Sequence, residues 1–244
     1  MPAHFYIGTA GWSIPAPLRP LVPEIGSGLA RYAGRLPAVE INSSFYRPHR
    51  PATYARWAAS VPPEFRFSVK LPKVITHERR LIDAADPLAR FLGEVSALGG
   101  KLGCLLIQLP PSLDLEVASV DGFLRDFRRR YPGPAVIEPR HSSWFSPRGD
   151  QLLVKYRISR VAADPALSDR AHEPGGYGNP VYYRLHGSPK QYHSAYDSAY
   201  LRALAARMAV HRGGGRDAWC MFDNTASGAA AANALELLAD PAVT

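Results

Sequence analysis

The sequence has little cysteine and no long apolar run. Only two of its 244 residues are cysteines, Cys104 and Cys220, and both lie in apolar stretches without a CxxC spacing. Such cysteines are typical of reduced core residues in a cytoplasmic protein, not of disulfides or thiolate metal sites. No stretch approaches the roughly 20 consecutive apolar residues of a membrane helix, so no membrane association is expected. The start, MPAHFYIGTAGW, lacks a basic segment followed by an apolar one, so no signal peptide is predicted.

Several common catalytic and nucleotide-binding motifs are also missing. No GxGxxG follows the first apolar run, and there is no P-loop or serine nucleophile elbow. The stretches GTAGW and LHGSPKQY lack the flanking residues that would make their hydroxyls nucleophiles. The sequence therefore predicts no cofactor.

The charge favours anionic partners in general. The formal net charge is +8 and the pI about 9.7. Part of the excess is local, because we interpret the run RDFRRR (125–130) as a solvated helix face. Net charge alone therefore gives little evidence for nucleic acid or phosphate as the partner.

Short apolar runs, each ended by polar or turn residues, recur eight times along the chain. They read FYIGTAGW, AVEINSSF, FRFSVKLP, GCLLIQLP, AVIEPR, RVAADP, VYYRLHG and WCMFDNT. Most are separated by segments with apolar residues three and four apart, namely PATYARWAASV, DPLARFLGEVSAL, SVDGFLRDFRRRY, QLLVKYR and AYLRALAARMAV. Alternating strands and helices predict an α/β fold with a parallel sheet. Eight such units predict a single-domain (β/α)8 TIM barrel over residues 1–244, with an open doubly wound sheet as the alternative.

Polar residues inside these runs point to a site. In AVEINSSF, Val39 and Ile41 share one face of the strand and can pack on helices, whereas Glu40 and Asn42 share the face that lines a barrel. The same alternation turns other polar side chains inward, mostly at the C-terminal ends of their strands: Lys70, Gln108, Glu138, Arg140, Asp164, Arg184, His186 and Asp223. Buried charges cost several kcal/mol unless they are paired or used. We therefore predict a functional pocket at the C-terminal rim, where barrel enzymes carry their catalytic groups.

The motifs taken together resemble the YecE-like family, a group of TIM-barrel proteins whose biochemical role is unassigned. The matching pieces are GTAGW, VEINSSFYR, RFSVKLPKVITH, LGCLLIQLPPS, IEPRHSSW, YYRLHGS and MFDNTASGAAAANALEL. They cover nearly the whole chain in the expected order. The resemblance implies a (β/α)8 barrel with a site at the C-terminal rim, and it implies no reaction. The segment SIPAPLRPLVPEIGSG, rich in proline and glycine, departs from the family pattern of further aromatics.

The preferred hypothesis is an enzyme of hydrolase type that acts on a phosphate- or sugar-containing substrate. A hydrolase needs one acid to donate a proton and another to activate water or attack, and Glu40 and Glu138 are the best candidates. His186 would orient the substrate or shuttle a proton, so the predicted catalytic residues are Glu40, Glu138, His186 and Asp223. The alternative for each acid is a structural ion pair with a neighbouring arginine or lysine.

Arginine forks and aromatic faces of the rim suit a small anionic or sugar-like ligand. The predicted substrate-binding residues are Trp12, Asn42, Tyr46, Lys70, His77, Gln108, Arg140, His141, Trp144, Asp164, Arg184, Tyr192 and Asn224. The segment DNTASGAAAANAL adds a helix start that can cap itself or bind phosphate. A divalent metal is possible but not favoured, because lysine and arginine neighbours oppose a cation, so no metal ligands are predicted.

A non-catalytic protein that binds nucleic acid or a phosphorylated metabolite is the competing hypothesis. The segments FYRPHRP (45–51) and KLPKVITHERR (70–80) interleave basic with aromatic or apolar residues, as single-strand binding sites do. The same loops can also be ordinary solvated loops, and no recognised nucleic-acid motif accompanies them.

Overall fold

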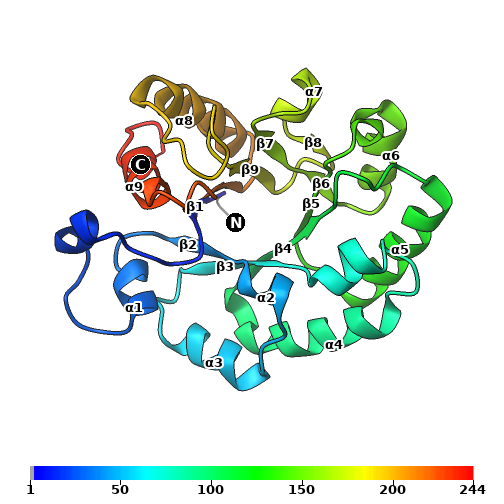
Figure 1. Ribbon diagram of the computed structural model, residues 1–244, viewed down its shortest axis with the longest axis horizontal. Coiled ribbons are helices and arrows are strands. Elements are labelled where there is room, and N and C mark those ends of the chain that lie inside the picture. Colours follow the sequence, from blue (N-terminus) through cyan, green and yellow to red (C-terminus); the bar gives the residue numbers. More distant parts are fainter. Residues whose placement is uncertain (1–2, 244) are drawn as a thin grey trace.

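A ring of parallel strands forms the centre of the structure, a computed structural model that describes residues 3–243 (Figure 1). The strands are β1 (Phe5–Ala10), β2 (Ala38–Ile41), β3 (Arg66–Lys70), β4 (Leu102–Gln108), β5 (Ala135–Glu138), β6 (Ser159–Arg160), β7 (Ala162–Asp164), β8 (Gly175–Gly176), β9 (Val181–Leu185) and β10 (Ala218–Phe222). Their order in the sheet is β7-β9-β10-β1-β2-β3-β4-β5-β6-β8. All pairs are parallel except β6 with the two-residue β8.

The barrel closes through the sixth predicted strand. That run is divided at Val161 into β6, which pairs with β5, and β7, which pairs with β9. The two ends of the parallel order are therefore consecutive in the chain, and the ring is nearly closed. The prediction of an α/β TIM-barrel fold is confirmed, and the open doubly wound sheet is not found.

Helices surround the ring on its outside (Figure 1). They are α1 (Gly28–Ala33), α2 (Ser43–Tyr46), α3 (Pro51–Ala59), α4 (Ala85–Val95), α5 (Val117–Arg130), α6 (Pro147–Lys155), α7 (Asp169–His172), α8 (Ser198–Gly213) and α9 (Ala229–Leu238), with short turns η1 (Ala16–Leu21), η2 (Val74–Glu78), η3 (Ser96–Lys101) and η4 (Ser142–Phe145). The five predicted helical segments correspond to α3, α4, α5, α6 and α8. After the sixth strand, the four-residue α7 and the antiparallel β8 occupy the place of a full helix.

Local sequence explains where these helices begin and which face they bury. The α5 helix starts at Glu116, whose carboxylate accepts hydrogen bonds from the Ala118 and Ser119 amides. Its buried residues, Val120, Phe123, Leu124 and Phe127, are three and four apart. The α6 helix starts at Ser146 with a proline in the first turn, where the missing amide hydrogen costs nothing.

The core has two layers, as the alternation along the strands predicts. Val39 and Ile41 belong to the large outer cluster between strands and helices. A smaller inner cluster fills the barrel and consists of Ala38, Cys104, Leu106, Val136, Val161, Tyr182, Trp219 and Met221. Trp219 packs so closely that a Cβ added to Gly103 would lie 2.6 Å from its ring. The charged residues described next lie on the same inner face as this cluster.

The two cysteines are free and fully buried, one in each layer. Burial raises the pKa of both thiols well above its usual value. Within residues 3–243, no helix is long and apolar enough to cross a membrane.

Candidate functional site

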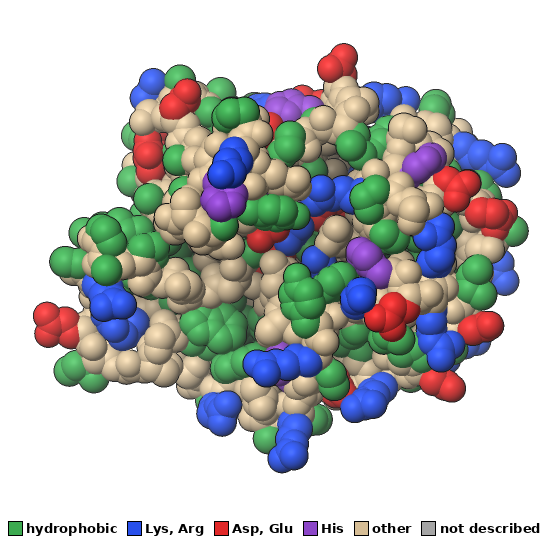
Figure 2. Space-filling model, in the orientation of Figure 1, with side chains coloured by type: hydrophobic (Ala, Val, Ile, Leu, Met, Phe, Trp, Pro, Cys, Tyr) green, Lys and Arg blue, Asp and Glu red, His purple; other side chains and the backbone are tan. Residues whose placement is uncertain are grey.

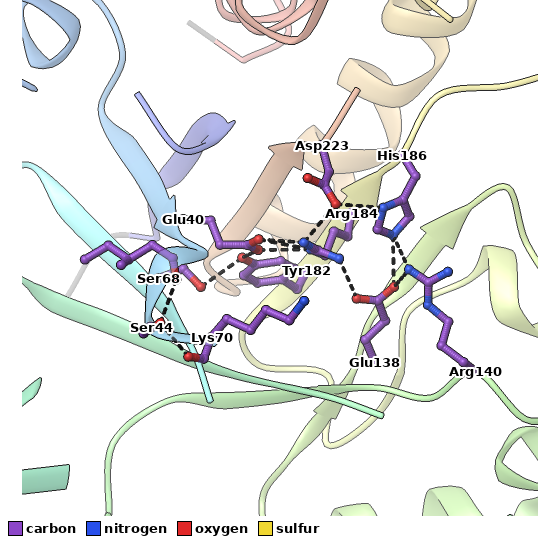
Figure 3. Close-up of polar contacts among 11 residues, drawn as sticks. Glu40, Ser44, Ser68, Lys70, Glu138, Arg140, Tyr182, Arg184, His186 and Asp223 are labelled. Atoms are coloured by element: carbon purple, nitrogen blue, oxygen red, sulfur yellow. Dashed lines mark hydrogen bonds and ion pairs between the residues drawn. The ribbon is translucent and has the colours of Figure 1, made fainter. Parts of the chain in front are cut away.

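A single guanidinium, that of Arg184 on β9, lies at the centre of a charged network inside the barrel (Figure 3). Its Nη2 is 2.8 Å from Glu40 Oε1, and its Nε is 3.1 Å from both Glu40 oxygens. Its Nη1 is 3.0 Å from Glu138 Oε2, and Nη2 is also 3.0 Å from Asp223 Oδ2. Burial alone would lower the pKa of Arg184, but Asp223, Glu40 and Glu138 outweigh it and raise that pKa well above its usual value. One cation thus joins carboxylates from β2, β5 and the end of β10.

Glu40 is completely enclosed. Its side chain is 0% exposed, and besides Arg184 it contacts the Tyr182 hydroxyl, 2.9 Å from Oε2. That hydroxyl also lies 2.9 Å from Ser68 Oγ. Burial raises the pKa of Tyr182 well above its usual value, so the phenol stays protonated as a donor to Glu40. Because every oxygen of Glu40 has a partner and none meets solvent, this carboxylate fits a role in positioning Arg184.

His186 is held between two carboxylates. Its Nδ1 is 3.0 Å from Asp223 Oδ2, and its Nε2 is 2.9 Å from Glu138 Oε1. Arg140 Nη2 lies 2.7 Å from the same Nε2 and 2.6 Å from Glu138 Oε1. A neutral ring with its proton on Nδ1 accepts from Arg140, whereas a charged ring donates from Nε2 to Glu138. The contacts of Nε2 therefore fit this nitrogen either as an acceptor from Arg140 or as a donor to Glu138.

The two carboxylates beside His186 stay ionised. Burial would raise the pKa of Glu138, but Arg140, then Arg184 and His186, outweigh it and hold that pKa well below its usual value. Burial would likewise raise the pKa of Asp223, and Arg184 together with the hydrogen bond from His186 lowers it instead. Both groups thus place negative charge beside the His186 ring.

Lys70, at the end of β3, is buried without an acidic partner. It is 7% exposed, its Nζ lies 4.1 Å from the centroid of the Phe45 ring, and no carboxylate of residues 3–243 lies within 4.0 Å of it. Burial, and then the charge of Arg184, lowers the pKa of Lys70 to about 8, although Glu40, Glu138 and Asp223 act in the opposite direction. In Figure 3 its side chain points into the network, and no dashed line leaves its ammonium.

The network lies under a depression in the surface. Figure 2, which looks along the barrel, shows the face hollowed near its centre, with basic and acidic side chains together inside the hollow. The Arg140 and Asp223 side chains are 16% and 12% exposed, against 1% for Glu138 and 0% for His186. A ligand in the depression therefore meets Arg140, Asp223 and Lys70 first.

Four further predicted residues lie close to this network. Gln108 is half-buried and pairs in register with Glu138. Tyr192 is 44% exposed, with its ring 5.8 Å from that of His186. Asn42 follows β2, and its buried Oδ1 has no hydrogen-bond partner within the described chain. His77 packs edge-to-face against Phe45, with ring centroids 4.9 Å apart, and burial followed by the charge of Lys70 lowers its pKa.

The structure does not bring the predicted aromatic residues Trp144, Trp12 and Tyr46 to the network. Trp144 is 0% exposed in the outer core and donates its Nε1 hydrogen to the Leu113 carbonyl, so its ring has no free surface. Trp12 packs edge-on against Trp57 of α3, 5.2 Å away. Tyr46 is 79% exposed and lines a separate groove beside α4.

Three predicted polar residues are engaged in structural hydrogen bonds instead. Asp164 accepts from the Tyr196 hydroxyl at 2.8 Å. Asn224 donates to the Ser194 carbonyl and to Asn233. His141 caps η4, where its Nδ1 lies 2.9 Å from Ser143 Oγ. These contacts shape the loops around the barrel mouth.

Sequence reasoning missed Tyr182 and Ser68 as members of the network. The signal was available for Tyr182, because it lies two residues before Arg184 and so on the same strand face. Tyr182 lies in one of the apolar runs, but a buried phenol hydroxyl requires a hydrogen-bond partner.

Acidic side chains and His186 converge here, yet within residues 3–243 no three His, Cys, Asp or Glu side chains are arranged to hold a metal ion. Arg184 lies among the carboxylates at hydrogen-bond distance, where a cation would otherwise be placed.

The family profile described as "Protein of unknown function DUF72" matches residues 6–242. The chain belongs to the DUF72 family. It is 32% identical to "UPF0759 protein YecE" of Escherichia coli (strain K12) over 178 residues, which cover 68% of this chain and 62% of that protein. It is 25% identical to "UPF0759 protein YunF" of Bacillus subtilis (strain 168) over 267 residues, 96% of this chain and 93% of that one. The resemblance to the YecE-like family is thereby confirmed.

A solved DUF72 structure confirms the fold. The crystal structure of a DUF72 family protein from Thermotoga maritima MSB8 superposes with a TM-score of 0.79 at 22% identity, covering 96% of this chain and 97% of that one. The match with the Escherichia coli protein spans less than two thirds of that protein's length.

Proposed function

We propose that this protein is an enzyme of hydrolase type that acts on a phosphate- or sugar-containing substrate at the C-terminal barrel rim. The observation that carries the proposal is a lysine ammonium without an acidic partner and a guanidinium nitrogen without a hydrogen-bond partner, both beside a histidine held between two carboxylates. The Lys70 ammonium has no carboxylate partner, and Arg140 Nε is buried without a hydrogen-bond partner among the described residues. A buried donor that lacks a partner is costly, and an anionic ligand group would supply an acceptor for Arg140 Nε and a counter-charge for Lys70.

Proton transfer in this proposal belongs to His186. Asp223 holds Nδ1 and stabilises the imidazolium, while the proton at Nε2 is shared with Glu138. Glu138 is the acid–base partner, and Arg140 binds the anionic group close to it. Glu40 serves as the support of Arg184, because its enclosure leaves no oxygen for a substrate or a water. The pairing of Glu40 with Glu138 as acid and base, expected from sequence, is thus replaced by Glu138 with His186.

The competing hypothesis of a non-catalytic nucleic-acid binder has no comparable support. Within the segment KLPKVITHERR, Arg80 donates to the Ser112 hydroxyl and carbonyl, and Arg79 donates to the Asp83 carbonyl. Both guanidiniums therefore already donate to the protein's own chain. The two free, buried cysteines support our placement of the protein in the cytoplasm.

A panel of chromogenic p-nitrophenyl phosphomonoesters, phosphodiesters and glycosides tests the proposal. We expect hydrolysis of one class, and losses of roughly 100-fold or more in Glu138→Gln and His186→Asn, the size typical of general acid–base groups. Glu64→Gln, at an exposed glutamate, is the matched control and should keep full activity. Turnover by neither wild type nor variants, combined with binding of inorganic phosphate in a calorimeter, would favour the non-catalytic alternative.

A further inference from the structure

Lys70 differs from every other lysine of the chain. Only five of the 29 basic residues are lysines. Lys73 pairs with Glu78 at 3.5 Å, Lys155 pairs with Asp121 at 2.5 Å, Lys101 donates to the Val61 carbonyl, and Lys190 is exposed. Lys70 alone among these five is buried in the barrel on a strand of the site, without an anion or carbonyl bound to its ammonium.

The choice of lysine at this place is chemically informative in a chain dominated by arginine. An arginine would bind an anion bidentately and stays charged at all relevant pH values. A lysine in a desolvated pocket can lose its proton and become a nucleophilic amine. The Phe45 ring on one side and the enclosed barrel on the other supply such a pocket.

We propose that Lys70 forms a Schiff base with a small aldehyde or ketone that carries an anionic group. The anionic group would bind Arg140, the partly exposed cation of the depression, and the carbonyl carbon would face Lys70 Nζ. This activity goes beyond the hydrolysis proposed above and does not depend on it, because the adduct forms whether or not any ester or glycoside bond is cleaved.

The step is balanced within the site. The neutral Nζ attacks the carbonyl carbon, and the C=O π pair moves to oxygen, which takes up a proton. The carbinolamine then loses water as the nitrogen lone pair forms the C=N bond, so amine, carbonyl and one proton give iminium and water. The charged groups that act on Lys70 are Arg184, Glu40, Glu138 and Asp223, and Lys70 in turn acts on His77.

The fraction of reactive amine supports the same reading. Because burial lowers the pKa of Lys70 to about 8, a larger share of its amine is neutral near physiological pH than in an exposed lysine. An unperturbed lysine has only about one part in a thousand neutral at that pH. Lys70 is therefore more nucleophilic at this pH than an exposed lysine of the same chain.

Reductive trapping tests the proposal on the intact protein. Wild-type protein is incubated with glycolaldehyde phosphate and sodium cyanoborohydride, which reduces the C=N bond to a stable secondary amine, and the adduct is located by peptide mapping. We expect one equivalent at Lys70, at least about tenfold faster than at Lys73 at pH 7.5, with a rate that rises toward pH 8 and then levels off.

Variants and a second probe separate the possible outcomes. Lys70→Arg and Lys70→Met should abolish the adduct, whereas Lys73→Arg, three residues away and exposed, should leave it unchanged, and circular dichroism verifies folding. Glycolaldehyde without phosphate should react more slowly at Lys70, and Arg140→Gln should slow only the phosphorylated probe. Equal labelling of all five lysines in wild type would overturn the proposal whatever the variants do, and equal rates for both probes would overturn the anionic part. Hydrolysis is measured separately, so failure of either proposal is distinguishable from failure of the other.

Discussion

Removing the central guanidinium should be the most damaging single change to the barrel interior. Arg184→Met keeps much of the side-chain volume but leaves Glu40, Glu138 and Asp223 without the cation that contacts all three. Removing one partner of a buried ion pair costs about 3–5 kcal/mol, because the remaining charge stays desolvated. For a chain of this length, that corresponds to a fall in Tm of roughly 6–20 °C.

The pH dependence of this loss has a definite sign. In the wild type the pKa of Asp223 is lowered in the folded state, so its stabilisation is present above its unfolded pKa of about 3.9 and is lost as pH falls through the folded value. Without Arg184 the burial of Asp223 dominates and raises that pKa, so the folded variant takes up a proton at higher pH. We therefore expect the free-energy difference between wild type and Arg184→Met to be larger at pH 8 than at pH 5.

Urea unfolding at both pH values, followed by circular dichroism, measures these differences. The matched control is Arg129→Met on α5, where the arginine side chain is 74% exposed and its pair with Asp126 should contribute little. Arg184→Lys should give an intermediate loss, since one ammonium cannot reach three carboxylates. A stability of Arg184→Met within about 1 kcal/mol of wild type at pH 8 would refute the view that this cation holds the network together.

Three smaller experiments address other parts of the structure. Tyr182→Phe should lower the unfolding free energy by about 1–3 kcal/mol, because Glu40 loses a buried donor, and equal urea midpoints would contradict that hydrogen bond. Gly8→Ala should reduce stability by about 1–3 kcal/mol or more, since an added Cβ would overlap the Ala38 carbonyl oxygen, and an unchanged Tm would show that β1 and β2 can separate freely. The two buried cysteines should react with Ellman's reagent only after unfolding, and rapid labelling of the folded protein would argue against their burial.

Much of the fold could be predicted from the sequence, because strand alternation is a local property. The side-chain period of two assigned Val39 and Glu40 correctly to opposite faces without knowledge of any neighbour strand. The irregular part was harder. Nothing in RVAADP indicates that the strand divides at Val161, since this depends on pairing with β5 on one side and β9 on the other.

The location of the charged residues in the barrel could be predicted from the sequence, but the pairing of acids with cations could not. Alternation brings Glu40, Glu138, Arg184 and His186 to one mouth, yet which acid pairs with which cation depends on distances across the barrel. Trp144 was wrongly expected in the site, because it follows the end of a strand as the rim residues do. In the structure the η4 turn directs its ring into the outer core.

The aromatic side chains inside the barrel determine whether a small molecule could pass through it. Tyr182 and Trp219 stack with ring centroids 5.9 Å apart, and the centroid of the Tyr6 ring lies 4.4 Å from that of Trp219. These rings fill the inside of the barrel next to the charged groups, and the Tyr182 hydroxyl joins the two layers through its hydrogen bond to Glu40. The inside of the barrel is therefore closed by packed side chains on one side of the charged groups and is not an open channel. A ligand bound as proposed above would therefore have to leave through the opening by which it entered.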